Sequence, residues 1–138
     1  MQVMKVSYKV AEKKSYCFTD HKDFKDVLPR YFDPIQEHFY LLPVLRQEFT
    51  IEEISRGMLD NAAIDPKVIF GTMLRKYPNS GCFFVAHNHP SGNIEPSEDD
   101  KELTSRLNEA CGLMCYRLLD HFIFNSYACY SFVAHGLL

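Results

Sequence analysis

The sequence has no run of lysine or arginine that could form a cationic stripe. It carries 15 Lys and Arg against 18 Asp and Glu, which gives a formal net charge of −3 and a pI near 6.0. This charge provides no overall attraction to the phosphate backbone of nucleic acids. Direct DNA binding is therefore not supported by charge. The lysines that cluster near the N-terminus are best explained as the solvated face of a strand: Lys5, Lys9, Lys13 and Lys14.

The sequence also lacks the features of secreted and membrane proteins. Its five cysteines are odd in number and scattered, which does not suit a disulfide scaffold. No apolar run is long enough to cross a membrane, and no charged segment followed by an apolar core opens the chain. These absences favour a cytoplasmic protein. Cys111 and Cys115 could form a metal pair, but we favour core packing, because buried cysteine behaves mainly as a small hydrophobe.

Size and composition predict one compact domain. A chain of 138 residues with 46% hydrophobic content is long enough to bury one core. The sequence shows no internal repeat and no low-complexity linker. We therefore expect residues 1–138 to fold as a single domain.

The first half of the chain predicts a strand, a helix and a hairpin. Alternation of apolar and polar residues over 1–10 is typical of a half-buried strand. A helix that Pro29 shortens or kinks follows and ends at Pro34. Two apolar runs within 35–57 then predict a β-hairpin, in which Pro43 favours an edge position or a bulge.

The second half predicts two helices that carry apolar stripes. Asp65 caps the first helix, which ends at 79–81 and whose buried stripe consists of Ile69, Met73 and Leu74. The second helix begins at Ser97 and ends near Gly112. Its buried positions follow at steps of three and four residues: Leu103, Leu107, Ala110 and Met114.

Three further strands complete the predicted sheet. The continuous apolar run over 82–87 is typical of a central strand that is buried on both faces. Strands over 116–124 and 128–136 follow the second helix. The order β-α-β-β-α-β-α-β-β predicts a mixed sheet with helices packed on it, in the α/β class.

The segment HNHPSGNIEPSEDD, residues 87–100, combines residue types that bind metals. His87 and His89 stand at the end of the predicted central strand and share a face, because they are two positions apart. The turn-forming residues that follow let the chain double back and bring the carboxylate of Asp100 beside them. Two histidines and one aspartate are three protein ligands for zinc, and a catalytic zinc keeps a fourth position for water. The sequence predicts one Zn²⁺ per chain, although such ligands accept several divalent ions.

The same segment also matches an ordinary helix start. Ser97 and Asp100 fit the serine-x-x-acid capping pattern. Capping and catalysis do not exclude each other, and the hydroxyl of Ser97 could also donate to an oxyanion.

Glu37 is the candidate general acid and base. It shares a face of its predicted strand with Phe39 and Leu41, and a lone buried carboxylate among apolar groups is costly. Metallohydrolases use such a carboxylate to move a proton from water to the leaving group. The alternative is a surface position at the end of the strand. Other acids compete for the role: Glu52, Glu53, Glu95 and Glu98.

The segment 87–100 resembles the JAMM metalloprotease signature, His-x-His-Pro followed at fixed spacing by Ser-x-x-Asp, in the form found in bacterial RadC-like proteins of the DNA repair protein RadC family. The likeness extends over roughly residues 19–138. It includes the words EHFYLL, EEISRGMLDNAAIDPKVIF, LLDHFIF and YSFVAHG.

The resemblance implies a JAB/MPN-type fold, a curved mixed β-sheet flanked by helices with a cytidine deaminase-like layout. It implies that zinc is held by His87, His89 and Asp100. It further implies that Ser97 assists the oxyanion and that Glu37 is the general acid and base. A family pair implies a supporting role around the metal for Asp120 and His121, with a salt link at a strand end as the alternative.

Two departures from the family pattern matter. The helix-hairpin-helix segment that many RadC-like proteins carry ahead of this domain is absent from the sequence, which removes the usual argument for DNA contact. The hairpin after Glu37 looks shorter than usual, with Pro43 and 46–48 in place of a typical Leu-Asp-x-x-Asn turn. The placement of Glu37 is therefore the weakest transfer from the family.

Two functions of different classes follow. The first is a JAMM-type zinc hydrolase that cleaves a peptide or isopeptide bond in a protein or peptide substrate. The second is a non-catalytic accessory module of DNA repair or mobile-element biology, in which zinc only holds the loop. Nucleotide deamination is weaker, because the Pro-Cys-x-x-Cys ligand pair is missing. A homodimer could form through an edge strand such as the one containing Pro43.

Overall fold

The computed structural model describes residues 15–17, 22–57 and 64–138. The strand predicted over 1–10 lies outside these ranges. No helix within the described ranges is long and apolar enough to span a membrane.

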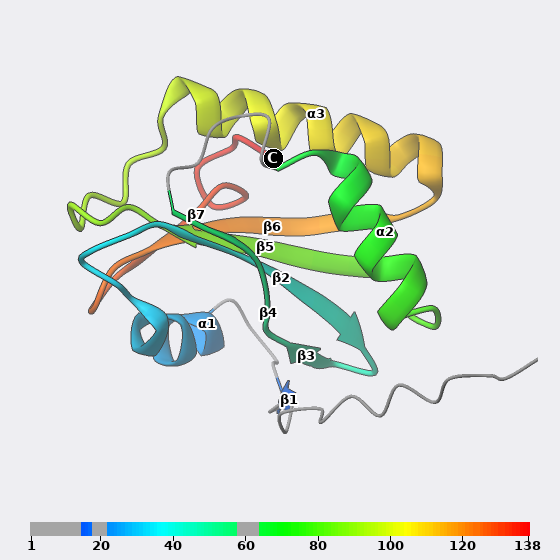
Figure 1. The fold of residues 1–138 in the computed structure, drawn as a ribbon, viewed down its shortest axis with the longest axis horizontal. Coiled ribbons are helices and arrows are strands. Elements are labelled where there is room, and N and C mark those ends of the chain that lie inside the picture. The colour runs from blue at the N-terminus through cyan, green and yellow to red at the C-terminus, as the bar shows by residue number, and fades with distance from the viewer. Residues whose placement is uncertain (1–14, 18–21, 58–63) are drawn as a thin grey trace, which may run out of the picture.

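A seven-stranded mixed sheet forms the centre of the fold (Figure 1). Its order is β1-β3-β2-β5-β6-β7, and β4 pairs with β2. Only β5 and β6 run parallel among the described pairs, and α3 connects them, because parallel neighbours require a crossover. The strands are β1 (Ser15–Cys17), β2 (His38–Leu45), β3 (Glu48–Thr50), β4 (Glu52–Arg56), β5 (Cys82–Asn88), β6 (Arg117–Phe124) and β7 (Cys129–Ser131).

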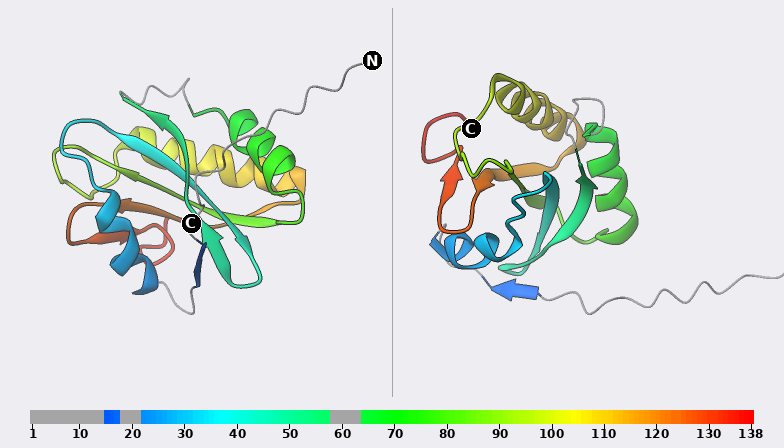
Figure 2. Two further views of the ribbon diagram at one scale, coloured as in Figure 1. Left: turned by 60° about the horizontal axis from the view of Figure 1, so that its bottom comes forward. Right: turned by 60° about the vertical axis from the view of Figure 1, so that its left-hand side comes forward.

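Helices cover both faces of this sheet (Figures 1 and 2). On one face lie α2 (Pro66–Lys76) and α3 (Glu98–Met114). On the other face lies α1 (Lys22–Val27), which continues into the 3-10 helix η1 (Leu28–Tyr31). The expected mixed sheet flanked by helices is confirmed.

Each face has its own apolar core. The α2 and α3 face buries Ile69, Met73 and Leu107 against β2 and β5. The α1 face is built around Phe24, whose ring centroid lies 4.5–4.7 Å from three other phenylalanine rings: Phe49, Phe84 and Phe122. Two separate cores hold β5 between them, as predicted for a continuous apolar strand.

The predicted starts of α2 and α3 are confirmed, whereas some residues predicted to be buried later in these helices are exposed. The side chain of Asp65 accepts the Lys67 N–H at 2.9 Å and caps α2, and Pro29 converts the end of α1 into a 3-10 turn. Leu74, expected in the buried stripe, is 57% exposed, because α2 packs through the row of Ile69 and Met73. Leu74 lies beyond the edge of that row.

The end of α3 also differs from the prediction. The helix continues past Gly112 to Met114, and Cys115 takes the left-handed conformation with φ of 60°. Met114 is 45% exposed and not buried. Cys111 packs in the core as expected, whereas Cys115 is exposed.

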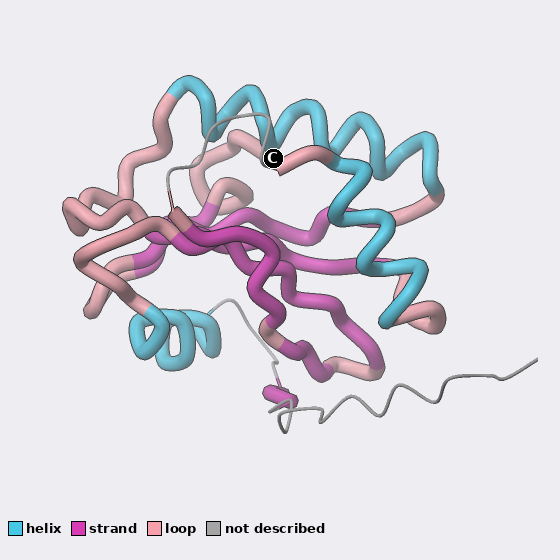
Figure 3. The backbone as a smooth tube through the Cα atoms, in the orientation of Figure 1, coloured by secondary structure: helices cyan, strands magenta, loops and turns pink. Residues whose placement is uncertain are grey.

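Pro43 does not lie in an edge strand. β2 pairs with β5 on one side and with both β3 and β4 on the other. The second arm of the hairpin is interrupted between β3 and β4 (Figure 3), and Leu42 and Pro43 pair with no described residue on that side. A central strand tolerates the proline, because the neighbouring ladder is open there. β2 therefore offers no free edge for a second copy of the chain.

The last strand is shorter than predicted. β7 ends at Ser131, whereas the expected strand ran to 136. The carboxylate of Asp120 accepts the Val133 N–H at 3.0 Å and also the hydroxyl of Ser131. These bonds turn the chain away from the sheet after β7.

Candidate metal centre

Three candidate ligands converge where β5 ends and α3 begins. Nε2 of His89 lies 3.1 Å from Nε2 of His87 and 3.0 Å from Oδ2 of Asp100. Oδ1 of Asp100 lies 3.1 Å from Nε2 of His87. Among the described residues, these three form the one group of histidine, cysteine and acidic side chains that could hold a metal ion.

The start of α3 orients the carboxylate of Asp100. The hydroxyl oxygen of Ser97 accepts the Asp100 N–H at 3.1 Å, and Oδ2 of Asp100 accepts the Ser97 N–H at 2.9 Å. This reciprocal pair is a capping box, so one aspartate both caps the helix and faces the two histidines.

A chain of buried hydrogen bonds sets the direction in which His87 presents its lone pair. The Thr104 hydroxyl donates to the Asp100 carbonyl at 2.7 Å, so its oxygen is left to accept from Nδ1 of His121 at 2.6 Å. Nε2 of His121 then accepts from Nδ1 of His87 at 2.8 Å. With its proton on Nδ1, His87 directs the lone pair of Nε2 toward Asp100.

The second histidine is oriented in the same way by the loop. Nδ1 of His89 donates to the carbonyl of Asn93 at 2.8 Å, which leaves Nε2 as the acceptor nitrogen. Two lone pairs therefore face each other across the 3.1 Å that separates Nε2 of His87 from Nε2 of His89. A cation between them would remove this repulsion, and a divalent ion with two imidazole ligands and one carboxylate suits the donor set.

The pKa values follow the same arrangement. Burial raises the pKa of Asp100, but His87 and His89, which donate hydrogen bonds to its carboxylate when their Nε2 atoms carry protons, outweigh this effect and hold the pKa well below its ordinary value. A metal ion would take the place of these protons. The hydrogen bond to Asp100 raises the pKa of His89. Burial lowers the pKa of His121 well below its ordinary value, which keeps this imidazole neutral.

Glu37, Ser97, His89 and Asp100 line one cleft. The volume of this cleft is about 540 Å³. Glu37 is half-buried and directly precedes β2, so it is not within the strand as predicted. Ser97 is exposed at the start of α3. The structure thus brings together all five residues to which we assign the chemistry.

Comparison with known proteins identifies the family. A family model described as a RadC-like JAB domain matches residues 17–137. The chain belongs to the RadC-like JAB family. It is 39% identical over 108 residues to a UPF0758 protein of Chlorobium chlorochromatii, covering 77% of this chain and 48% of the relative. It is 35% identical over 117 residues to a UPF0758 protein of Pelodictyon phaeoclathratiforme, covering 83% and 52%. The chain therefore spans about half the length of these curated relatives.

In this RadC-like domain, Asp120 and His121 have different roles, because their side chains lie on opposite faces of β6. A register shift leaves Leu119 as an extra residue in β6, since Phe83 pairs with Leu118 and Phe84 pairs with Asp120. A one-residue shift reverses the face of every later side chain, so His121 points to His87 and Asp120 points away. The carboxylate of Asp120 instead accepts the His121 N–H at 2.7 Å and holds the chain after β7.

Two residues of the RadC-like site were missed in the sequence. Thr104 lies one helical turn after Asp100, and Asn93 supplies its backbone carbonyl to His89. The spacing of four residues between Asp100 and Thr104 on one helix face could have indicated the first. Backbone contacts such as that of Asn93 leave no signal in the residue type.

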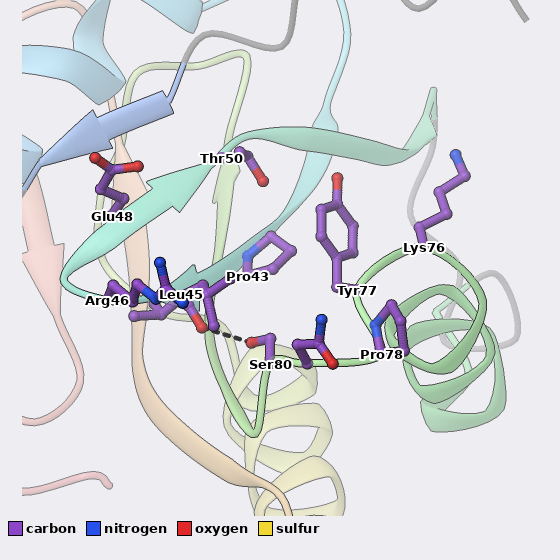
Figure 4. Close-up of a pocket in the computed structure, with 11 residues that line it drawn as sticks. Pro43, Leu45, Arg46, Glu48, Thr50, Lys76, Tyr77, Pro78 and Ser80 are labelled. Carbon is purple, nitrogen blue, oxygen red and sulfur yellow. Dashed lines mark hydrogen bonds between the residues drawn. The ribbon is translucent and has the colours of Figure 1, made fainter.

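A second cavity, of about 440 Å³, lies at the other end of β2 and β5 (Figure 4). There the Ser80 hydroxyl donates to the Val44 carbonyl at 2.6 Å, and the buried Thr50 hydroxyl has no hydrogen-bond partner among the described residues. None of the three candidate ligands lines this cavity, so the candidate chemistry of the RadC-like domain belongs to the cleft around His89.

Proposed function

We propose that this RadC-like domain is a JAMM-type, zinc-dependent hydrolase that cleaves a peptide or isopeptide bond. The observation that carries the proposal is the convergence of His87, His89 and Asp100 beside a cleft whose lining includes His89, Asp100 and Glu37. The substrate we propose is a protein or peptide, because the net charge of −3 provides no attraction to nucleic acid. A cytoplasmic location is part of the same proposal.

His87, His89 and Asp100 would hold the ion. When bound, zinc supplies Lewis acidity, which lowers the pKa of water and polarises a carbonyl oxygen. The outer hydrogen bonds from His87 to His121 and from His89 to Asn93 keep both Nε2 lone pairs directed to one point.

Glu37 would carry the proton. Its carboxylate takes the proton from the attacking water and returns it to the leaving amine, so that the amide nitrogen departs as a neutral amine. The half-buried position of Glu37 at the cleft wall suits this exchange, because the carboxylate contacts both the cleft and solvent. The exposed Ser97 hydroxyl would donate a hydrogen bond to the developing oxyanion.

The test combines metal content with turnover. Mass spectrometry of the purified protein should find zinc near one equivalent in the parent and in Glu37→Gln, and none in His87→Ala or Asp100→Ala. Zinc-dependent cleavage of a peptide mixture should disappear in Glu37→Gln. Glu98→Gln, which removes an exposed acid at the start of α3, is the matched control and should retain both the zinc and the cleavage activity.

Three outcomes would count against the proposal. A parent that takes up no metal when zinc is supplied would refute the metal site. A Glu37→Gln variant that retains zinc and full cleavage would refute the role of Glu37. Zinc that is bound, with no cleavage in the parent, would favour the accessory module.

A further inference from the structure

Asn88 stands between the two metal-binding histidines, yet its side chain serves the opposite face of the sheet. Residues of a strand alternate between faces, so His87 and His89 point to the cleft whereas Asn88 points away from it. Its side chain is completely buried. A buried amide must satisfy its donors and acceptor within the protein.

Both N–H donors and the oxygen of this amide bond to one short segment. Oδ1 of Asn88 accepts the His38 N–H at 2.8 Å. Nδ2 donates to the carbonyl of Asp33 at 2.8 Å and to the carbonyl of Gln36 at 3.2 Å. The single side chain therefore binds the backbone on both sides of Glu37.

Backbone pairing with β5 does not reach Glu37. Pairing of β2 with β5 begins at Phe39, which lies opposite His87, two residues after Glu37, whereas pairing with β4 begins at His38. Asn88 lies opposite His38, where the next backbone pair of the ladder would form. Here the side chain of Asn88, and not its backbone, bonds to the His38 N–H. The carbonyl of Glu37 accepts the Gly57 N–H at 2.8 Å, which fixes the residue from the side of β4.

His38 closes the same segment from outside. Nε2 of its ring lies 2.8 Å from Oδ2 of Asp33, and Nδ1 is bonded to Glu53 of β4. The segment 33–38 is thus tied to β5 through Asn88 and to β4 through His38 and Gly57.

We infer that Asn88 is the positioning residue that sets Glu37 against the metal centre, an assignment that rests on the proposed function for the role of Glu37. The same three-residue stretch then supplies two ligands on one face and the clamp for the proton carrier on the other. Displacement of a catalytic group by about 1 Å can cost about 100-fold in rate. Asn88→Ala should therefore lower turnover by about 100-fold while leaving the ligands in place.

The experiment measures amide hydrogen exchange and zinc affinity in the full chain, neither of which requires a substrate. In Asn88→Ala the Gly57 amide, which Asn88 does not contact, should exchange at least about tenfold faster, because the Glu37 carbonyl that accepts it is released. Zinc affinity should fall by less than about tenfold, the smallest loss expected when a partner of a metal ligand is removed. If Asn88→Ala does not fold, the isosteric Asn88→Asp answers the same question.

Asn88→Asp retains the acceptor for the His38 N–H but directs an anionic oxygen at the Asp33 and Gln36 carbonyls. In this variant, amide exchange should rise at Asp33, Ile35 and Gln36, while the His38 amide stays protected. Asn125→Ala is the matched control, because Asn125 is also buried and, among the described residues, its side chain bonds to backbone groups elsewhere, at Gly92, Tyr127 and Ala128. Its Gly57 amide should exchange as in the parent.

The results separate this inference from the proposed function. Unchanged exchange at Gly57 in both Asn88 variants, or a loss of zinc as complete as in His87→Ala, would overturn the role of Asn88. Faster exchange at Gly57 with zinc retained supports the clamp, even if the parent cleaves nothing and the hydrolase proposal fails.

Discussion

Two buried polar networks lie back to back at the end of β5, and each contains a histidine. On the cleft side His121 is a neutral imidazole between Thr104 and His87. On the other side the ring of His38 lies between the carboxylates of Asp33 and Glu53. The neighbours of these two histidines shift their pKa values in opposite directions, down for His121 and up for His38. A neutral ring can pass on a fixed hydrogen-bond direction, whereas a charged ring can only hold its two acceptors together.

The electrostatic contrast follows from what surrounds each ring. Burial is the main cause that lowers the pKa of His121. Burial also lowers the pKa of His38, but hydrogen bonds to Asp33 and Glu53 outweigh that effect and raise it above 6.5. Burial lowers the pKa of both rings, so the hydrogen-bond partners decide whether the final pKa is raised or lowered.

The largest effect should come from removing the neutral ring. His121→Phe leaves Nδ1 of His87 and the Thr104 hydroxyl oxygen without a partner inside the core. We expect zinc affinity to fall by about 10- to 100-fold, as for other lost partners of metal ligands. A zinc titration against a competing chelator measures it, and an unchanged affinity would show that His121 does not orient His87.

A smaller effect is expected from the far end of the same chain. Thr104→Val leaves the Nδ1–H of His121 buried without an acceptor, which should cost about 1–3 kcal/mol in the free energy of unfolding. Thr72→Val is the matched control, because the Thr72 hydroxyl also donates to the carbonyl four residues earlier, at 2.8 Å from Val68.

Chemical denaturation of the two threonine variants isolates the bond to His121. Thr104→Val should be the less stable of the two and should also bind zinc more weakly, whereas Thr72→Val should bind zinc as the parent does. Equal losses of stability with equal zinc affinity would contradict the assigned chain.

On the opposite side of the sheet, the prediction concerns pH. Because the folded pKa of His38 is raised above 6.5, its contribution to stability is complete below about pH 6.5 and is lost as pH rises through the folded value. Apparent melting temperatures between pH 6 and 9 should therefore fall more steeply in the parent than in His38→Gln. Parallel curves for the two proteins would show that the ring of His38 is not charged in the folded state.

The smallest effect belongs to Arg56, at the outer rim of the second network. Nη2 of Arg56 lies 2.7 Å from Oε2 of Glu53, but its side chain is 63% exposed. Exposed ion pairs contribute about 0–1 kcal/mol, so Arg56→Ala should change the free energy of unfolding by less than about 1 kcal/mol. A loss of unfolding free energy as large as that of Thr104→Val would mean that the exposed Arg56–Glu53 pair is a main source of the stability of this network.

The local parts of this comparison could be predicted from sequence. The apolar run before His87, the turn-rich loop and the cap at Ser97 are signals within a few residues of one another, and they predict where the ligands meet. The mixed sheet followed from the order of the predicted elements, and the family resemblance followed from this segment and from similar words over roughly residues 19–138. The position of Asn88 between two histidines was visible, but its partners 50 and more residues earlier were not.

The roles of Asp120 and His121 could not be separated without the structure. Their faces depend on one extra residue in β6 relative to β5, and the two strands are joined by all of α3. No local pattern reports such a shift, because register is set by pairing between distant segments. The exposed position of Leu74 was missed for a related reason, since helix packing decides which apolar row is covered.

Phe132 shields the buried hydrogen-bond chain from water. Its ring stacks on the ring of His121 with centroids 4.5 Å apart and planes 10° apart, and its backbone N–H donates to the His121 carbonyl at 3.1 Å. A water molecule reaching His121 could donate to Nε2 or accept from Nδ1, and either bond would compete with the existing ones. The turn after β7 therefore acts as a seal: by keeping water out, it preserves the order of donors and acceptors that runs from Thr104 to His87.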